Sequence, residues 1–308
     1  MKKMVNAVHA EGYFYKHDLK KKVSGEKAKN PGVEYINGTL DVATNEACTN
    51  IVSFHFSYVT AKTNSGQENR TFTLLSDIID GKYKSVMGDG KEVAVKLAVD
   101  SAIDVNDFYD KKDELVSAKR NEGGFVNVVS ELNEDESKRA TFKTDMIITG
   151  TKEVEADEEK NLPRKLILKG HIFNFRNEIM PVEFSVLNEG AMNYFEDLEP
   201  SSKTPVFTQI SGEQVSLVYK VVKTEESAFG DDLVTEVERS RKDYVVTWSK
   251  KEPYVWDDEE FILASEVAEA LANRQVKLAE IKQRNDEYKN SKNATPAVAS
   301  AVPGGFTF

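Results

Sequence analysis

The sequence predicts a mainly β protein that ends in one helix and a flexible tail. Apolar and polar residues alternate over most of residues 4–256, with the period of two that is typical of half-buried antiparallel strands. From Asp257 the apolar spacing fits a helix instead, and residues 291–308 are rich in small residues, Pro and Gly. A chain of 308 residues has room for about two domains. We therefore expect two β domains before the helix.

The first half contains a series of candidate strands. In the first strand, Val8, Ala10, Gly12 and Phe14 share one face. In the third, Phe54, Phe56 and Tyr58 share a face with Val52, which predicts that they lie in the core. Residues 95–103 are apolar enough to form either a strand or a helix. The other candidate strands are residues 36–42, 72–75, 93–103, 114–118, 125–132 and 141–149.

A charged segment at residues 153–163 interrupts this pattern and predicts a linker or a long solvated loop. Strand periodicity resumes in four later segments. Between the last two of these segments, residues 225–238 hold six acidic residues and no Lys or Arg, which suggests an exposed acidic loop. The later strands are residues 166–172, 182–186, 215–222 and 244–248. We expect domains at residues 1–152 and 153–256, then a helix at 257–290 and the tail at 291–308.

The expected helix has Asp257 or Asp258 as its N-cap. Its apolar stripe is thin, and Arg274 and Asn285 interrupt it. A surface helix packed on the second domain is the favoured interpretation, and a coiled-coil or partner-binding helix is the alternative. The stripe consists of Val267, Leu271, Leu278, Ile281 and Tyr288.

Composition and spacing argue against several classes of protein. The single Cys48 excludes an internal disulfide and a multi-cysteine metal site. The four histidines lack metal-ligand spacing, and no catalytic constellation is evident, so we expect no enzyme activity, no cofactor and no metal. No apolar run approaches the ~18 residues of a membrane span, and the N-terminus lacks the features of a secretory signal. We expect a cytoplasmic protein without membrane contact. Its 52 acidic against 41 basic residues give a net charge of −11, which at first argues against nucleic acid.

Asn6, Val8, Ala10, Gly12 and Phe14 follow one another at every second position. This spacing resembles the opening strand of the oligonucleotide/oligosaccharide-binding (OB) fold in bacterial and phage single-stranded DNA-binding proteins. Residues 36–44 and 50–56 look like the two strands that follow it. Residues 106–115 look like the family's later hairpin, with Asp113 in place of a Gly. The resemblance covers residues 4–132 and implies an N-terminal OB barrel.

A weaker internal similarity relates the segment after Gly12 to the segment after Gly170. Residues 182–188 likewise resemble the strand at residues 40–44. We therefore expect a second OB-like barrel, or another small β domain, in the second half.

The resemblance implies stoichiometric binding of single-stranded DNA in replication or repair. Such binding needs aromatic faces for the bases and cations for the phosphates. If Gly12 and Phe14 face the barrel interior, strand alternation turns the neighbouring tyrosines outward, unless a linker or the other domain covers them. The same parity in the second half turns Phe173 and Phe175 outward. Residues 16–29 hold six lysines against two acidic residues, although a solvated loop explains that charge equally well. The predicted contacts are Tyr13, Tyr15, Lys16, Lys20, Lys21, Lys22, Lys119, Arg120, Phe125, Phe173, Phe175 and Arg176.

The chain ends with Phe306 and Phe308 after a small-residue spacer. In the resembled family a disordered tail with an acidic motif and a terminal Phe docks into replication proteins. Here no acid adjoins the aromatic residues, so a docking tail and an ordinary frayed terminus are both open. The long loops suit a phage protein in the host cytoplasm, and the sequence leaves a homo-oligomer open. The rival function is a structural or assembly protein of a virion, and a metal-dependent nuclease is a weaker rival.

Overall fold

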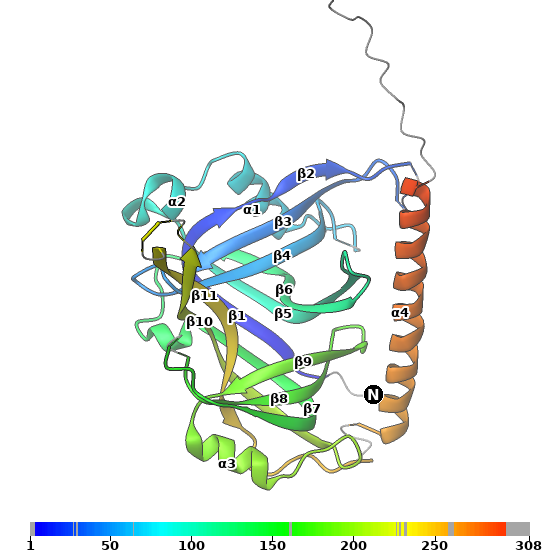
Figure 1. The fold of residues 1–308 in the computed structure, drawn as a ribbon. Helices are drawn as coiled ribbons and strands as arrows, with labels where there is room; N and C mark the ends of the chain where they lie inside the picture. Colours follow the sequence, from blue (N-terminus) through cyan, green and yellow to red (C-terminus); the bar gives the residue numbers. More distant parts are fainter. Residues whose placement is uncertain are drawn as a thin grey trace, which may run out of the picture.

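The computed structural model describes residues 4–293 apart from 27, 29, 64, 160–161, 226, 228, 231–232 and 258–261. It is mainly β with a long C-terminal helix, as the sequence predicts (Figure 1). Two rings of strands lie one above the other in Figure 1, and the helix runs along one side of both.

The first ring consists of β1 (Asn6–His17), β3 (Glu34–Ala43), β4 (Ile51–Thr60), β6 (Leu115–Val128) and β5 (Lys96–Tyr109). Each strand pairs with the next in that order, and β5 pairs again with β1, which closes the ring. All pairings are antiparallel except the short parallel contact between β4 and β6. This strand order is that of the five-stranded OB barrel.

The remaining elements of the first half lie around this ring. The short strand β2 (Lys20–Val23) pairs with β3 at the edge of the sheet. Between β4 and β5 the chain forms α1 (Arg70–Ile79), α2 (Val86–Asp89) and the 3-10 turn η1 (Lys91–Val93). Leu75 and Ile78 of α1 are buried in the core.

The second ring repeats the same order. It consists of β7 (Ala140–Val154), β8 (Lys165–Phe173), β9 (Ile179–Val186), β11 (Leu233–Ser249) and β10 (Val206–Glu225), and β10 pairs back with β7. The contact between β9 and β11 is again parallel. The strand pairing of the second half is therefore that of a second OB-like barrel, as predicted.

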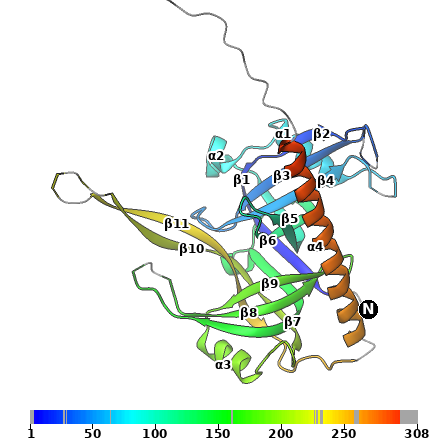
Figure 2. The same ribbon diagram turned by 45° about the vertical axis from the view of Figure 1, so that its right-hand side comes forward.

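Two short elements complete the second half. The 3-10 turn η2 (Glu136–Lys138) precedes β7, and α3 (Glu189–Asp197) connects β9 to β10. The hairpin of β10 and β11 extends away from the second ring, as Figure 2 shows.

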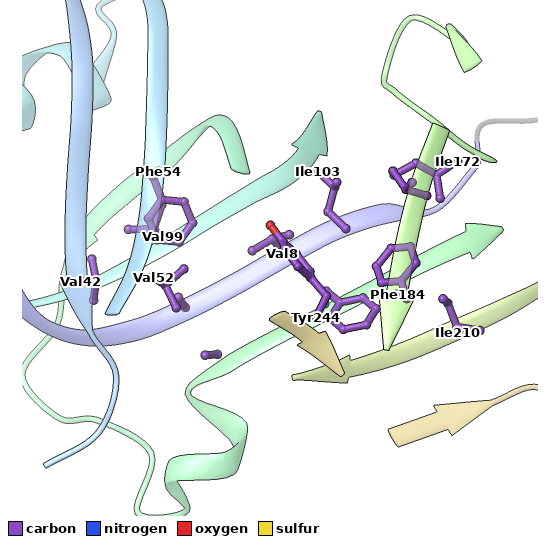
Figure 3. Close-up of a cluster of buried hydrophobic side chains, with 14 of the residues drawn as sticks. Val8, Val42, Val52, Phe54, Val99, Ile103, Ile172, Phe184, Ile210 and Tyr244 are labelled. Carbon is purple, nitrogen blue, oxygen red and sulfur yellow. The ribbon is translucent and has the colours of Figure 1, made fainter. Parts of the chain in front are cut away.

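The two rings are joined into one body through β1. Its first half, from Asn6 to Ala10, pairs with β7, while its second half pairs with β3. Buried residues from both rings form one continuous cluster around it, including Val8, Phe54 and Phe184 (Figure 3). Gly12 lies where β1 crosses β3, and a Cβ there would come within 2.0 Å of the Ala43 carbonyl oxygen. Only glycine fits at that crossing.

Helix α4 (Ala264–Asn293) spans both rings and contacts β5 and β9. Its apolar anchors are Val267 and Ala270, which pack with Phe173 and Ile262. Farther along the helix, the contacts with the first ring are polar. The Arg274 Nη2 atom binds Asp107 Oδ1 at 2.8 Å. The polar residues that interrupt the predicted stripe are thus the ones that attach the helix.

The tip of the β5–β6 hairpin provides the other attachment of α4. Asp113 has φ 68°, the left-handed conformation that usually requires glycine. Its carboxylate accepts hydrogen bonds from Lys282, from Asn285 at 3.1 Å and from Lys289 at 2.7 Å. Hydrogen bonds from Lys282 and Lys289 lower the pKa of Asp113 to about 2. The side chain that replaces the expected Gly therefore holds the helix.

Several predicted elements differ from the structure. Residues 72–75 lie in α1, because Asn69 caps a helix there by accepting from Thr71 N at 3.1 Å. Residues 95–103 lie largely in β5 rather than in a helix. Much of the predicted acidic loop at 225–238 is strand, since Leu233 begins β11. Residues 20–23, expected in a loop, form β2.

The helix begins at Ala264, seven residues after Asp257. Asp257 still contributes to its start, because its carboxylate accepts a hydrogen bond from Ala264 N at 2.8 Å. Asp258, Phe306 and Phe308 lie outside the described residues.

The charged segment at residues 153–163 begins with the last two residues of β7 and continues to β8 within the second ring, so the alternative of a loop is the one observed. The domain limits at residues 152 and 153 stay a prediction. Because β7 belongs to the second ring from Ala140 onward, we propose a limit between β6 and β7 instead.

Candidate nucleic-acid interface

A cleft of about 530 Å³ lies over the outward face of β8 and β9. Along β8, Leu168 and Ile172 point into the core, while Lys169 and His171 point outward into the cleft. Glu183 on β9 lies opposite Lys169, at 3.8 Å from its ammonium group. The second and third strands of the second ring therefore form the floor of the cleft.

Four cationic side chains line the cleft, against two carboxylates. Lys169 comes from β8, Lys119 from β6 of the first ring, and Arg241 and Lys242 from β11. One of the two carboxylates, Asp243, is neutralised within the protein, as described next. The cleft is therefore a local positive site in a protein of net charge −11.

Asp243 is nearly buried and held in a tight network. Its carboxylate accepts hydrogen bonds from Lys165 Nζ at 2.6 Å and Ser185 Oγ at 2.7 Å. Burial alone would raise the pKa of Asp243, but these hydrogen bonds outweigh it and lower the pKa. Asp243 therefore stays ionised, and its charge is balanced by Lys165 from inside rather than by the cations of the cleft.

Lys119 and Lys242 each reach across from one ring to the other. The Lys119 ammonium donates to the Glu183 carbonyl and lies 4.1 Å from the centroid of the Tyr244 ring. Lys242 donates to Ser53 Oγ on β4. Burial lowers the pKa of Lys119 to about 8 and also lowers the pKa of Lys242. Both rings thus contribute cations to one cleft.

His171 stands on the cleft floor. Burial, and secondly the charge of Arg274, lower its pKa. The imidazole is therefore neutral at physiological pH and presents an uncharged planar ring to the cleft.

The predicted tyrosines lie on the outward face of β1, as alternation with the buried Phe14 requires. Tyr13 already has partners, because its hydroxyl donates to Glu46 Oε2 at 2.9 Å and Lys91 Nζ lies 5.1 Å from its ring centroid. Tyr15 is half-buried.

The predicted phenylalanines divide into two groups. Phe125 and Phe175 are each 73% exposed, and Arg176 covers one side of the Phe175 ring at 5.0 Å. Phe173 is 1% exposed, so its predicted outward position is wrong. Ile262, which precedes α4, and Ala270 of α4 cover the face to which alternation assigned it. Likewise Tyr58, expected in the core, is 48% exposed and packs against Tyr35 at 4.5 Å.

Apart from Arg176, which lies between β8 and β9, the predicted cations that the structure describes lie in two places. Lys20, Lys21 and Lys22 are exposed on β2, where Lys21 pairs with Asp80 at 2.9 Å, and Lys16 lies 3.9 Å from Asp41. Lys119 lines the cleft, and Arg120 lies beside it, 2.8 Å from Glu122. Lys27 and Lys29 lie outside the described residues.

The cleft therefore brings Lys119, but not Arg120, together with cations that the sequence did not single out. These are Lys169, Arg241 and Lys242. A usable signal was the cluster of basic residues that follows the acidic stretch, at positions 239, 241 and 242.

Within the part of the chain that the structure describes, no three His, Cys, Asp or Glu side chains are grouped so as to hold a metal ion. None of the described helices is both long and apolar enough to cross a membrane.

Comparison with known proteins gives one family. The model of the YorF family matches residues 5–284, which is nearly the whole chain. The chain belongs to the YorF family. No curated protein matches this YorF chain.

Among solved structures, this YorF chain is similar to a deletion mutant of the single-stranded DNA binding protein from Thermus aquaticus. The identity is 10% and the TM-score is 0.45, with 84% of this chain and 100% of that chain covered. At this TM-score the likeness carries no argument, and the OB assignment stands on the strand order of the two rings.

Proposed function

We propose that this YorF-family protein binds single-stranded DNA in the cleft over β8 and β9, and acts stoichiometrically in replication or repair. One observation carries the proposal. The four cations Lys119, Lys169, Arg241 and Lys242 line a cleft whose floor is formed by the second and third strands of an OB ring, and this is the face on which OB folds bind oligonucleotides.

The charge of the cleft suits a phosphate backbone. Cations from both rings face the cleft. Long Lys and Arg side chains can contact the phosphates of a strand whatever its base sequence. The same face of the first ring carries Tyr35 and Tyr58, whose partly exposed rings offer a stacking surface. A strand leaving the cleft past Lys242 reaches β4 of that ring, because Lys242 binds Ser53.

The exposed aromatic residues supply further stacking positions in this proposal. Tyr13, Tyr15, Phe125 and Phe175 all present ring surface outside the core. The lysines of β2 provide cations at the edge of the first ring. Phe173 is no longer included, since it is buried. Docking of a replication protein on Phe306 and Phe308, and a homo-oligomer, stay predictions.

The test is the salt dependence of oligonucleotide binding. Four phosphate contacts give a slope of about −2.8 for log K against log salt, because each contact on a single strand contributes about −0.7. Replacing Arg241 with Gln removes one contact, so the slope becomes about −2.1 and affinity at about 0.1 M salt falls about fivefold. Fluorescence anisotropy with a labelled dT oligomer measures both quantities.

Lys84→Gln is the matched control, because Lys84 is exposed, pairs with Asp89 of α2 and does not line the cleft. Its slope should equal that of the natural protein. Flat anisotropy at low salt would overturn the proposal. An unchanged slope in Arg241→Gln would place the strand on another surface.

A further inference from the structure

A second, smaller pocket adjoins the cleft where the two rings meet. It has a volume of about 290 Å³ and lies between β4, β6, β10 and β11. We call it the junction pocket; its polar lining includes Asn50, Asn121 and Gln214. It shares Lys119, Lys242 and Asp243 with the cleft, so a strand bound in the cleft passes its entrance.

A chain of hydrogen bonds fixes the orientation of Gln214 in this pocket. The Tyr244 hydroxyl donates to Asn121 Oδ1 at 2.7 Å, which turns the Asn121 amide so that Nδ2 donates to Gln214 Oε1 at 2.9 Å. The Gln214 Nε2 group is thereby left as a donor. It finds no acceptor among the residues that the structure describes, although Gln214 is only 7% exposed.

Asn50 presents a hydrogen-bond acceptor to the same pocket, where Gln214 presents a donor. Its Nδ2 donates to Thr44 Oγ1 at 2.8 Å and to the Gln214 carbonyl at 3.0 Å. Its Oδ1 is buried and has no donor within the described part of the chain. An unmet buried donor and an unmet buried acceptor each cost about 1–3 kcal/mol, which favours a ligand that satisfies both.

The ligand must therefore offer a hydrogen-bond acceptor and an N–H donor together, beside a negative charge. Lys119, Arg120 and Lys242 line the pocket around the two amides, together with the Asp243 carboxylate, whose charge Lys165 balances. A free phosphate has no N–H group for Asn50. The edge of a nucleobase carries both kinds of group, and its attached phosphates suit the three cations.

We infer that the junction pocket takes one base of the bound strand, turned out of the cleft between the two rings. Gln214 Nε2 donates to an acceptor on the base edge, and Asn50 Oδ1 accepts from a base N–H. The inference rests on the proposed function. It adds base recognition at one position to binding that otherwise depends on phosphates and stacking.

The decisive measurement is the side-chain amide signal of Gln214 in ¹⁵N-labelled protein, assigned with Gln214→Met. A dT oligomer should shift this signal. An abasic oligomer of the same length, which keeps the phosphates, should bind in the cleft without shifting it. A shift with both oligomers, or with neither while anisotropy shows binding, would overturn the inference and leave the proposed function intact. Absence of any binding would instead refute the proposed function.

Gln214→Met gives a second readout. Asn121 Nδ2 keeps its hydrogen bond to the Ser53 carbonyl at 3.1 Å, so the fold should tolerate the change. Affinity for the dT oligomer should fall about tenfold, as expected for the loss of a buried hydrogen bond, with no change for the abasic oligomer. Gln67→Met is the control, because Gln67 is exposed between β4 and α1 and should leave both affinities unchanged. Equal losses for both oligomers would contradict base recognition. If Gln214→Met fails to fold, triple-resonance experiments on the natural protein assign the Gln214 amide signal, and the comparison of the two oligomers still decides.

Discussion

The ion pair between Arg274 and Asp107 predicts how strongly α4 is attached to the first ring. The side chains are 9% and 4% exposed, and Ser117 Oγ also donates to Asp107 Oδ1 at 2.6 Å. Removing one member of such a buried pair leaves the other charge without compensation, which costs about 3–5 kcal/mol. Replacing both members with apolar residues of similar size removes that penalty.

The experiment is a double-mutant cycle with Arg274→Met, Asp107→Leu and the double variant. Each single variant should lose about 3 kcal/mol of unfolding free energy, while the double variant should lie within about 1 kcal/mol of the natural protein. Urea denaturation followed by circular dichroism measures these values. Hydrogen exchange of α4 amides shows whether the loss is global or confined to the helix.

A matched surface pair serves as the control. Lys277 and Glu178 also connect α4 to the second ring, at 3.0 Å, but their side chains are 48% and 38% exposed. The same cycle on that pair should give a coupling below about 1 kcal/mol. If the Arg274 and Asp107 variants are simply additive, the reasoning from burial is wrong.

Three further predictions concern the cleft and the aromatic residues. Because burial holds the pKa of Lys119 near 8, Lys119 loses its charge between pH 7 and pH 9, and oligonucleotide affinity at low salt should fall over that range. Lys119→Arg keeps its charge and should show a weaker pH dependence in the same anisotropy titration, so equal pH profiles would contradict the assignment. Tyr15→Ala should weaken binding by up to about 1–3 kcal/mol through lost stacking with little change in a urea melt. Phe173→Ala should instead lower the unfolding free energy by about 3–5 kcal/mol, and an unaffected melt would contradict its burial.

The first ring was largely predictable from the sequence, because its strands alternate cleanly between one core face and one polar face. Phe14 and Phe54 are buried as the alternation requires. The second ring was harder to place, since the similarity between the segments after Gly12 and Gly170 matches a first strand with a second one. Both glycines do lie at strand crossings, where a Cβ would come within 2.0 Å of a carbonyl oxygen. The similarity between the two segments therefore indicates that both contain a glycine at a strand crossing, and not that the two strands are equivalent.

The failures have a common physical origin in contacts between distant segments. Phe173 is buried by residues about ninety positions later, so strand periodicity alone could not locate it. The segment at residues 72–75 is too short and apolar for its periodicity to distinguish a strand from a helix. The feature of the sequence that indicates a helix there is Asn69, which caps α1. The cleft itself joins β6, β8, β9 and β11, and no local pattern predicts which of their cations share one surface.

The shared edge of β1 has a consequence for the growing chain. All five strands of the first ring lie before residue 129, so that ring can close during synthesis while β7 is still unmade. Until residues 140–144 emerge, one edge of Asn6–Ala10 has unsatisfied backbone groups that attract other strands. A second nascent chain could offer its own β7 to that edge, giving a strand-exchanged pair. The N-terminal half of β1 is thus the place where correct assembly depends on the order and timing of synthesis.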